Sequence, residues 1–124
     1  IRDCLLSRGL GEVYKRQEMK QDILNSLSEI LNQRKQANAD ESYTAKLFND
    51  GVNSILKKVG EEAIETIIAS KSGDNAAIIH EVADLWFHSL VLLKHHGLEH
   101  SDVLNELESR FGLSGLDEKA NRKN

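Results

Sequence analysis

Two stretches decide the fold of this chain: Gly60-Glu61-Glu62-Ala63-Ile64-Glu65 and Glu81-Val82-Ala83-Asp84. Each places two acidic residues three positions apart inside an otherwise apolar helical pattern, and residues at i and i+3 lie on the same face of a helix. Each stretch therefore carries one carboxylate pair. The residues between the pairs suffice to end one helix, make a turn and begin an antiparallel helix. The sequence thus predicts four carboxylates that face one another where two helices meet.

These four carboxylates indicate a metal site. Like charges at this range repel unless a cation lies between them, and ligands that are all oxygen favour Mg²⁺, with Mn²⁺ as the other candidate. The alternative is a solvated acidic face on two surface helices. Both helices are apolar on nearly every other side, and the line through Glu81 lacks the lysines that a solvated face usually carries at i+4. We therefore expect four metal ligands: Glu62, Glu65, Glu81 and Asp84.

Composition limits the class of protein. The chain has 124 residues, of which 29% are charged and 5% aromatic, and it contains no proline; this favours helices over sheets and suits a single domain. The formal net charge of −4 argues against a nucleic-acid partner. Apolar runs fall well short of about 18 residues, so we expect no membrane partner. A single cysteine, Cys4, agrees with the reducing cytoplasm.

Helical periodicity predicts an all-α bundle of four to five helices. Amphipathic patterns cover residues 20–37 and 52–70, and an almost wholly apolar pattern covers residues 75–95. A short helix between the first two would begin after Ser42 as N-cap and break near Asn49-Asp50-Gly51, and Asp74 would cap the apolar helix. A last helix carries Val103, Leu104, Leu107 and Phe111, with Ser101 or Asp102 as its N-cap.

The apolar helix over residues 75–95 predicts a homodimer. Three other helices of so small a chain cannot cover a helix that is apolar around most of its circumference. We therefore expect a second copy of the chain to cover part of it, through Leu85, Trp86 or Leu92.

The two ends of the chain do not fit the helical pattern. Residues 1–18 show no sustained apolar stripe, whereas Met19, the only methionine, opens a periodic segment. We expect this leader to lie outside the fold, as either a sequence artefact or a native extension. The helical domain would span residues 19–112, followed by a polar tail over residues 113–124.

Three lysines are candidates for substrate binding. Lys57 and Lys58 lie one turn before Glu61 and Glu62, where an ammonium group can meet phosphate oxygens. Lys58 is the better placed of the two because it shares the acidic stripe. Lys46 is the third candidate.

His88 stands one turn beyond Asp84. It is either a core histidine or an imidazole that orients the metal-binding carboxylate through a ring N–H.

A longer set of residues closely resembles the phosphoribosyl-ATP pyrophosphohydrolase family of histidine biosynthesis. The match runs from about residue 23 to about residue 122. The two acidic motifs alone indicate the wider all-α nucleoside triphosphate pyrophosphatase superfamily, and the other segments narrow the resemblance to this family. They are Ser42-Tyr43-Thr44, Leu47-Phe48, Gly51, Ile55, Lys57-Lys58-Val59-Gly60-Glu61-Glu62-Ala63, Glu65, Glu81-Val82-Ala83-Asp84-Leu85, His88, Arg110-Phe111-Gly112, Ser114-Gly115-Leu116 and Glu118-Lys119-Ala120.

The resemblance implies Mg²⁺-dependent hydrolysis of phosphoribosyl-ATP to phosphoribosyl-AMP and pyrophosphate by a cytoplasmic homodimer. The metal would neutralise the triphosphate, and the metal or a spare carboxylate, Glu61 or Glu62, would activate water. Two other functions fit parts of the pattern. A house-cleaning nucleoside triphosphate pyrophosphatase would share the acidic motifs but not Ser42-Tyr43-Thr44 and the tail. A non-catalytic helical dimerisation module would carry the acids as a surface stripe.

Overall fold

In the computed structural model, which describes residues 22–112, every regular element of the described part is a helix. The elements follow in the order α2 (Ile23–Gln36), the short 3-10 helix η1 (Ala39–Glu41), α3 (Tyr43–Asp50), α4 (Val52–Ser72), α5 (Asn75–His95) and α6 (His100–Phe111). The predicted all-α fold is confirmed. The predicted leader (1–18) and tail (113–124) lie outside the described residues.

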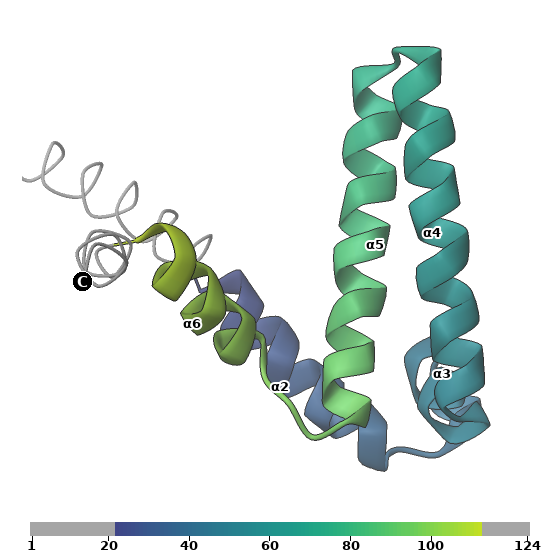
Figure 1. Cartoon of the computed structure of the whole chain (residues 1–124). Helices are drawn as coiled ribbons and strands as arrows, with labels where there is room; N and C mark the ends of the chain where they lie inside the picture. Colours follow the sequence, from purple (N-terminus) through teal and green to yellow (C-terminus); the bar gives the residue numbers. More distant parts are fainter. Residues whose placement is uncertain (1–21, 113–124) are drawn as a thin grey trace, which may run out of the picture.

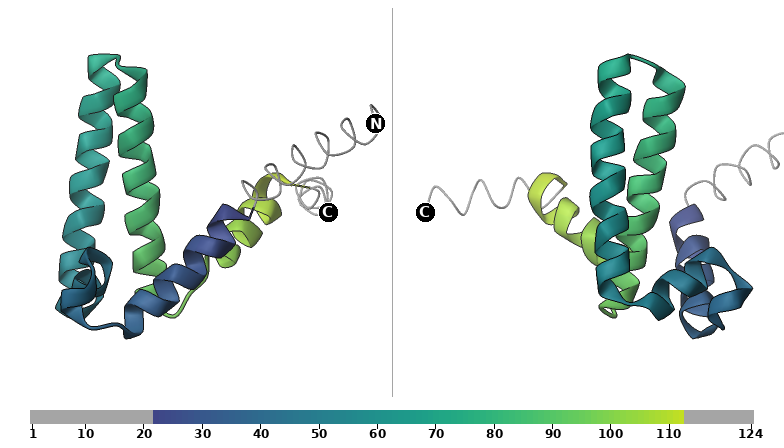
Figure 2. Two further views of the ribbon diagram at one scale, coloured as in Figure 1. Left: turned by 180° about the vertical axis from the view of Figure 1, so that it is seen from behind. Right: turned by 90° about the vertical axis from the view of Figure 1, so that its right-hand side faces the viewer.

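A long antiparallel hairpin of α4 and α5 dominates the structure (Figure 1). The short helix α3 packs at the base of α4, and α2 and α6 both leave the same end of the hairpin. The two further views show that the upper turn between α4 and α5 stands clear of the other described helices (Figure 2). The hairpin therefore relies on its own interhelical contact along most of its length.

Local sequence signals fix the start of α3, the end of α4 and the start of α5. Ser42 caps α3, its hydroxyl oxygen accepting from the backbone N–H of Ala45 at 3.0 Å. Asp74 caps α5 by accepting from two backbone N–H groups. Between these caps, Gly73 ends α4 with a φ of 74°, in the left-handed region that favours glycine. These predicted helix boundaries are confirmed.

The N-cap predicted for the last helix is wrong. Glu99, and neither Ser101 nor Asp102, caps α6, and the Asp102 carboxylate accepts from the Glu99 backbone N–H at 2.9 Å to complete a capping box. Tertiary contacts explain the difference, because the Glu99 carboxylate pairs with the buried Lys94 ammonium and accepts from the Ser28 hydroxyl. The hydrogen bond from Lys94 is the main reason that the pKa of Glu99 is lowered.

The core lies at the base of the hairpin. It consists of buried side chains from four helices: Leu31 of α2, Leu47 and Phe48 of α3, Ile55 of α4 and Val91 of α5. This cluster fixes α3 against α4, so it also sets the distance between the residues that the two helices present to solvent.

Both helices of the hairpin carry exposed apolar side chains. The side chains concerned are each more than half exposed within one chain: Ile64, Ile67, Ile68, Ile79 and Trp86. Ile67 is among them because the core helices α2 and α3 reach only the base of the hairpin. An exposed apolar area of this kind marks a contact surface.

By length and composition alone, α5 could cross a membrane. A single helix of this kind is weak evidence, because the core helix of a soluble protein passes the same test. Glu81 and Asp84 also lie within it, and carboxylates in the hydrocarbon layer are costly. The helix does not indicate a membrane protein.

Replacing Ile55 tests the base core. Ile55 is fully buried, so Ile55→Ala removes apolar contacts and leaves a cavity, and we expect it to lower the free energy of unfolding by about 2–4 kcal/mol. Chemical denaturation followed by circular dichroism measures this loss. The matched control is Leu56→Ala, at the neighbouring and partly exposed position, which should cost clearly less. Equal losses at the two positions would contradict the position of the core.

Candidate metal and phosphate site

The antiparallel hairpin brings acidic residues from both of its helices together. Glu62 of α4 and Glu81 and Asp84 of α5 each offer one carboxylate oxygen, and these oxygens all lie within 4.8 Å of one another. Glu62 is buried, and the other two are half-buried. Glu65 interacts with both Glu62 and Glu81 but does not belong to the group within 4.8 Å. Three of the four predicted ligands therefore converge, and the fourth lies beside them.

Crowding and burial make Glu62 and Glu81 hard to ionise. Burial is the main cause that raises the pKa of Glu62 from 4.5 to about 7, and the carboxyl groups of Glu65, Asp84 and Glu81 add to the effect. The neighbouring Glu65 side chain is the main cause that raises the pKa of Glu81, followed by burial. Negative charge in this cluster is therefore destabilised when no cation is bound.

The donor set fits a divalent cation. One oxygen of Glu62 and one oxygen of Glu81 are buried, and neither has a hydrogen-bond partner among residues 22–112. A buried carboxylate oxygen without a donor is costly. A cation between the helices would satisfy both oxygens at once, and a set made only of carboxylate oxygens suits Mg²⁺ or Mn²⁺.

The two histidines of α5 near the cluster have different partners. His80 Nε2 lies 3.3 Å from Asp84 Oδ2, so this exposed histidine contacts the candidate ligand directly. His88 is buried, and its Nδ1 lies 2.8 Å from the Asp84 backbone oxygen while its Nε2 lies 3.0 Å from the Tyr43 hydroxyl. Of the two predicted roles of His88, the buried position and the bond to the Asp84 backbone fit a core histidine, and the imidazole that contacts the Asp84 carboxylate is that of His80.

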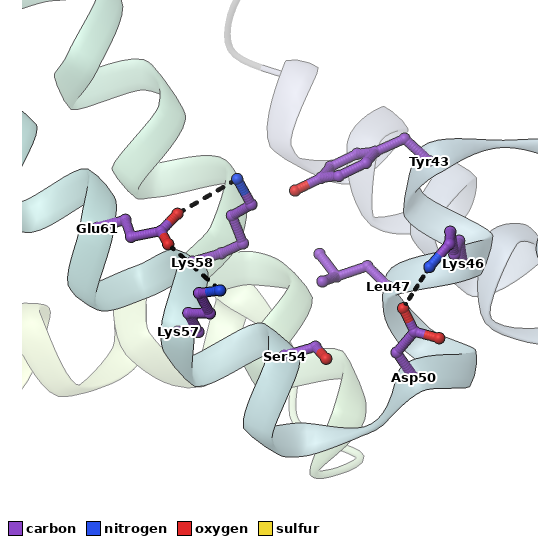
Figure 3. Close-up of a pocket in the computed structure, with 8 residues that line it drawn as sticks. All are labelled: Tyr43, Lys46, Leu47, Asp50, Ser54, Lys57, Lys58 and Glu61. Atoms are coloured by element: carbon purple, nitrogen blue, oxygen red, sulfur yellow. Dashed lines mark hydrogen bonds and ion pairs between the residues drawn. The ribbon is translucent and has the colours of Figure 1, made fainter.

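A surface hollow of about 230 Å³ lies between α3 and α4. All three predicted substrate lysines line it, together with Glu61 and four further residues: Tyr43, Leu47, Asp50 and Ser54 (Figure 3). The three ammonium groups outnumber the carboxylates of Asp50 and Glu61 in this lining, and this excess of positive charge favours an anion such as a phosphate chain.

Each lysine of the hollow faces a carboxylate. Lys46 Nζ lies 2.8 Å from Asp50 Oδ2. Glu61 lies between the other two lysines, 4.0 Å from Lys57 Nζ and 3.4 Å from Lys58 Nζ. Glu61 therefore belongs to the lysine hollow, whereas its chain neighbour Glu62 belongs to the carboxylate cluster. Consecutive residues of α4 thus connect the two parts of the site.

Sequence reasoning missed several residues of this site. Asp50 and His80 could have been found, because each lies four residues from a predicted site residue on the same helix, Lys46 and Asp84 respectively. Tyr43 reaches the hollow and His88 only through the packing of α3 against the hairpin, and no local spacing signals such a contact. Together the two parts define a class of protein: an all-α protein that can hold a divalent cation and a phosphate chain side by side.

Comparison with known proteins identifies the family within this class. Residues 24–111 match the phosphoribosyl-ATP pyrophosphohydrolase family. The chain is 57% identical over 102 residues to the phosphoribosyl-ATP pyrophosphatase of Methylococcus capsulatus, covering 82% of this chain and 97% of that protein. It is 52% identical over 105 residues to the enzyme of the same name from Chromobacterium violaceum, covering 85% of this chain and 97% of that protein. The chain belongs to the phosphoribosyl-ATP pyrophosphohydrolase family, which confirms the resemblance noted from its sequence.

The raised pKa of Glu62 predicts how stability depends on pH. In the unfolded chain this carboxyl ionises near its ordinary value of 4.5, whereas in the folded, metal-free protein it ionises near 7. Its contribution to stability is therefore fully present below about pH 4.5 and is lost as the pH rises through about 7. In a chelating buffer, Glu62→Gln should gain stability relative to the wild type as the pH rises.

Urea denaturation of both proteins at a series of pH values measures this difference. The control is Glu29→Gln, which replaces an exposed carboxylate of α2. Its free energy of unfolding should differ from that of the wild type by the same amount at every pH. A Glu62→Gln difference that does not change with pH would contradict the raised pKa.

Proposed function

We propose that this chain hydrolyses phosphoribosyl-ATP to phosphoribosyl-AMP and pyrophosphate in the cytoplasm, a step of histidine biosynthesis. Membership of the phosphoribosyl-ATP pyrophosphohydrolase family supports the activity. The observation that carries the chemistry is the pairing of a carboxylate cluster with a lysine hollow along α4. A triphosphate needs both, because cationic groups must neutralise its charge before water can attack phosphorus.

The carboxylate cluster holds the cation in this proposal. Glu62, Glu65, Glu81 and Asp84 bind Mg²⁺, or Mn²⁺ in its place, and the orphaned oxygens of Glu62 and Glu81 support this assignment. The bound ion supplies charge neutralisation at the phosphate and lowers the pKa of water. His80 contacts the Asp84 carboxylate and helps to hold it in position.

The lysine hollow binds the phosphate chain. Lys46, Lys57 and Lys58 surround it, and Lys58 is the least exposed of the three. Glu61 contacts Lys57 and Lys58, so its role is to position their ammonium groups. Of the two candidate bases, Glu62 is the better placed to accept a proton from water, because it is buried within the carboxylate cluster. Glu61 instead forms ion pairs with Lys57 and Lys58.

Replacing the cluster residues tests this proposal. Glu62→Gln, Glu65→Gln, Glu81→Gln and Asp84→Asn should each reduce turnover of phosphoribosyl-ATP by about 100-fold or more, since each removes a metal ligand or base. Without metal, the variants should be as stable as the wild type or more stable, because one of several crowded charges is gone. Added Mg²⁺ should raise their melting temperature less than it raises that of the wild type.

The exposed Glu29→Gln serves as the control and should behave as the wild type. Near-normal turnover of both Glu81→Gln and Asp84→Asn would contradict a metal site shared by α4 and α5. A parallel assay with nucleoside triphosphates checks the substrate, because the proposal requires phosphoribosyl-ATP to be hydrolysed faster than any of them.

We also propose that the chain works as a homodimer. Both helices of the hairpin expose apolar side chains in the single chain, namely Ile64, Ile67 and Ile68 on α4 and Ile79 and Trp86 on α5. A second copy that packs against the hairpin would remove such side chains from water, and burial of apolar area is the main force in such association.

Trp86→Glu should disrupt this dimer. A carboxylate buried in an apolar interface would be desolvated without a partner, so association should weaken strongly. Sedimentation at micromolar concentration should give twice 13.9 kDa for the wild type and the monomer mass for the variant. Asn105→Glu, an exposed position on α6, should remain dimeric. A wild type that sediments as a monomer would contradict the proposal.

A further inference from the structure

Tyr43 connects the lysine hollow to the carboxylate-bearing helix α5. Its side chain lines the hollow, and its hydroxyl lies 3.0 Å from Nε2 of the buried His88. The two rings also meet edge to face, with their centroids 6.1 Å apart. His88 continues the chain of hydrogen bonds, because its Nδ1 lies 2.8 Å from the backbone oxygen of Asp84.

The direction of these hydrogen bonds follows from the chemistry of the groups. A backbone carbonyl oxygen can only accept, so Nδ1 of His88 carries the hydrogen and donates it to Asp84. In the neutral imidazole, Nε2 is then an acceptor. The Tyr43 hydroxyl must therefore donate its proton to Nε2. Burial raises the pKa of Tyr43 above its ordinary value, which keeps that proton in place.

The Tyr43 oxygen is left as an acceptor that faces the hollow. Having given its only proton to His88, it presents lone pairs, and Figure 3 shows it pointing into the hollow on the side of Lys58. Within the described residues, its one hydrogen bond is the bond to His88. A phosphate oxygen is also an acceptor, so it cannot pair with this atom. Only a ligand group that donates a hydrogen can do so.

We propose that Tyr43 binds a hydroxyl of the nucleoside ribose of the substrate. This inference rests on the proposed function, which supplies a nucleotide as the ligand. Lys46, Lys57 and Lys58 provide donors for the phosphate chain, and the ribose is joined directly to that chain. Its hydroxyls are therefore the donors nearest to the lysine-bound phosphates.

The Asp50 and Glu61 carboxylates of the hollow already face its lysines, which leaves the hydroxyl oxygens of Tyr43 and Ser54 as acceptors. Of these two, Tyr43 has its proton directed at His88, and Ser54 is the position that the control below removes.

Binding of two nucleotides tests this assignment. ATP and 2′,3′-dideoxy-ATP differ only in the ribose hydroxyls, so calorimetry in the presence of Mg²⁺ should give the wild type an affinity about tenfold higher for ATP, the value of one net hydrogen bond. Tyr43→Phe keeps the ring and removes the acceptor, so its affinities for the two nucleotides should be equal. Loss of the hydrogen bond to the buried His88 should lower the melting temperature of the variant, and an unchanged circular dichroism spectrum at the temperature of the binding measurement confirms that it is folded.

Ser54→Ala is the matched control, since it removes another hydroxyl from the same hollow and should preserve the preference for ATP. The inference is overturned if the Tyr43→Phe variant still prefers ATP, or if it binds both nucleotides more weakly by the same factor. It is equally overturned if Ser54→Ala, and not Tyr43→Phe, removes the preference for ATP. It is also overturned if Tyr43→Phe raises the KM for phosphoribosyl-ATP without changing ATP binding, because the donor would then lie on the added phosphoribosyl group. Direct binding needs no hydrolysis, so this result is separate from the outcome for the proposed activity.

Discussion

Repulsion among the carboxylates of α4 and α5 is the constraint on which the rest of the structure depends. Glu62, Glu81 and Asp84 are held within a few ångströms of one another by two helices that pack along most of their length. Two buried oxygens lack hydrogen-bond partners in the described part of the chain, and the pKa of Glu62 is raised to about 7. A fold that places acids in this way is under strain when empty. In our proposal a divalent cation relieves this repulsion, because it lies between carboxylates that the helix packing already holds together.

The core at the base of the hairpin also places the lysine hollow beside the carboxylate cluster. Leu47 and Phe48 hold α3 in the core, and the same helix presents Tyr43 and Lys46 to the hollow beside Leu47. Lys57 and Lys58 complete it from α4. The proposed metal site and the proposed phosphate site therefore meet on a single helix, since Glu61 and Glu62 are adjacent in α4 and belong to different parts of the site.

The exposed apolar side chains of α4 and α5 explain why we propose that one chain needs a second copy. Helices α4 and α5 each carry candidate metal ligands on one side and a core residue at the base. Their remaining apolar sides need another element to shield them from water. In this chain, α2 and α6 leave the base of the hairpin and do not cover them. Partner contacts that bury Trp86 and the isoleucines of α4 would also hold α4 and α5 together against the repulsion of their carboxylates.

Much of this protein follows from local sequence patterns. The helical periods, the caps Ser42 and Asp74, and the turn at Gly73 were all predictable, because they depend on residues a few positions apart. The convergence of Glu62 with Glu81 and Asp84 also followed, since a short turn forces neighbouring helices to be antiparallel. The alignment of Lys57 and Lys58 with Glu61 needed only helical spacing.

Contacts between distant residues were decided by the tertiary structure alone. Glu99 caps α6 because Ser28, 71 positions away, helps Lys94 to hold its carboxylate, a preference that no local rule gives to glutamate. Tyr43 reaches His88, 45 positions along the chain, because core packing sets the place of α3. Helical periodicity shows which face of a helix is apolar. It cannot show which element packs on that face, because this depends on how far the other helices extend. This is why Ile67, apolar and in register with the core, is exposed in the single chain.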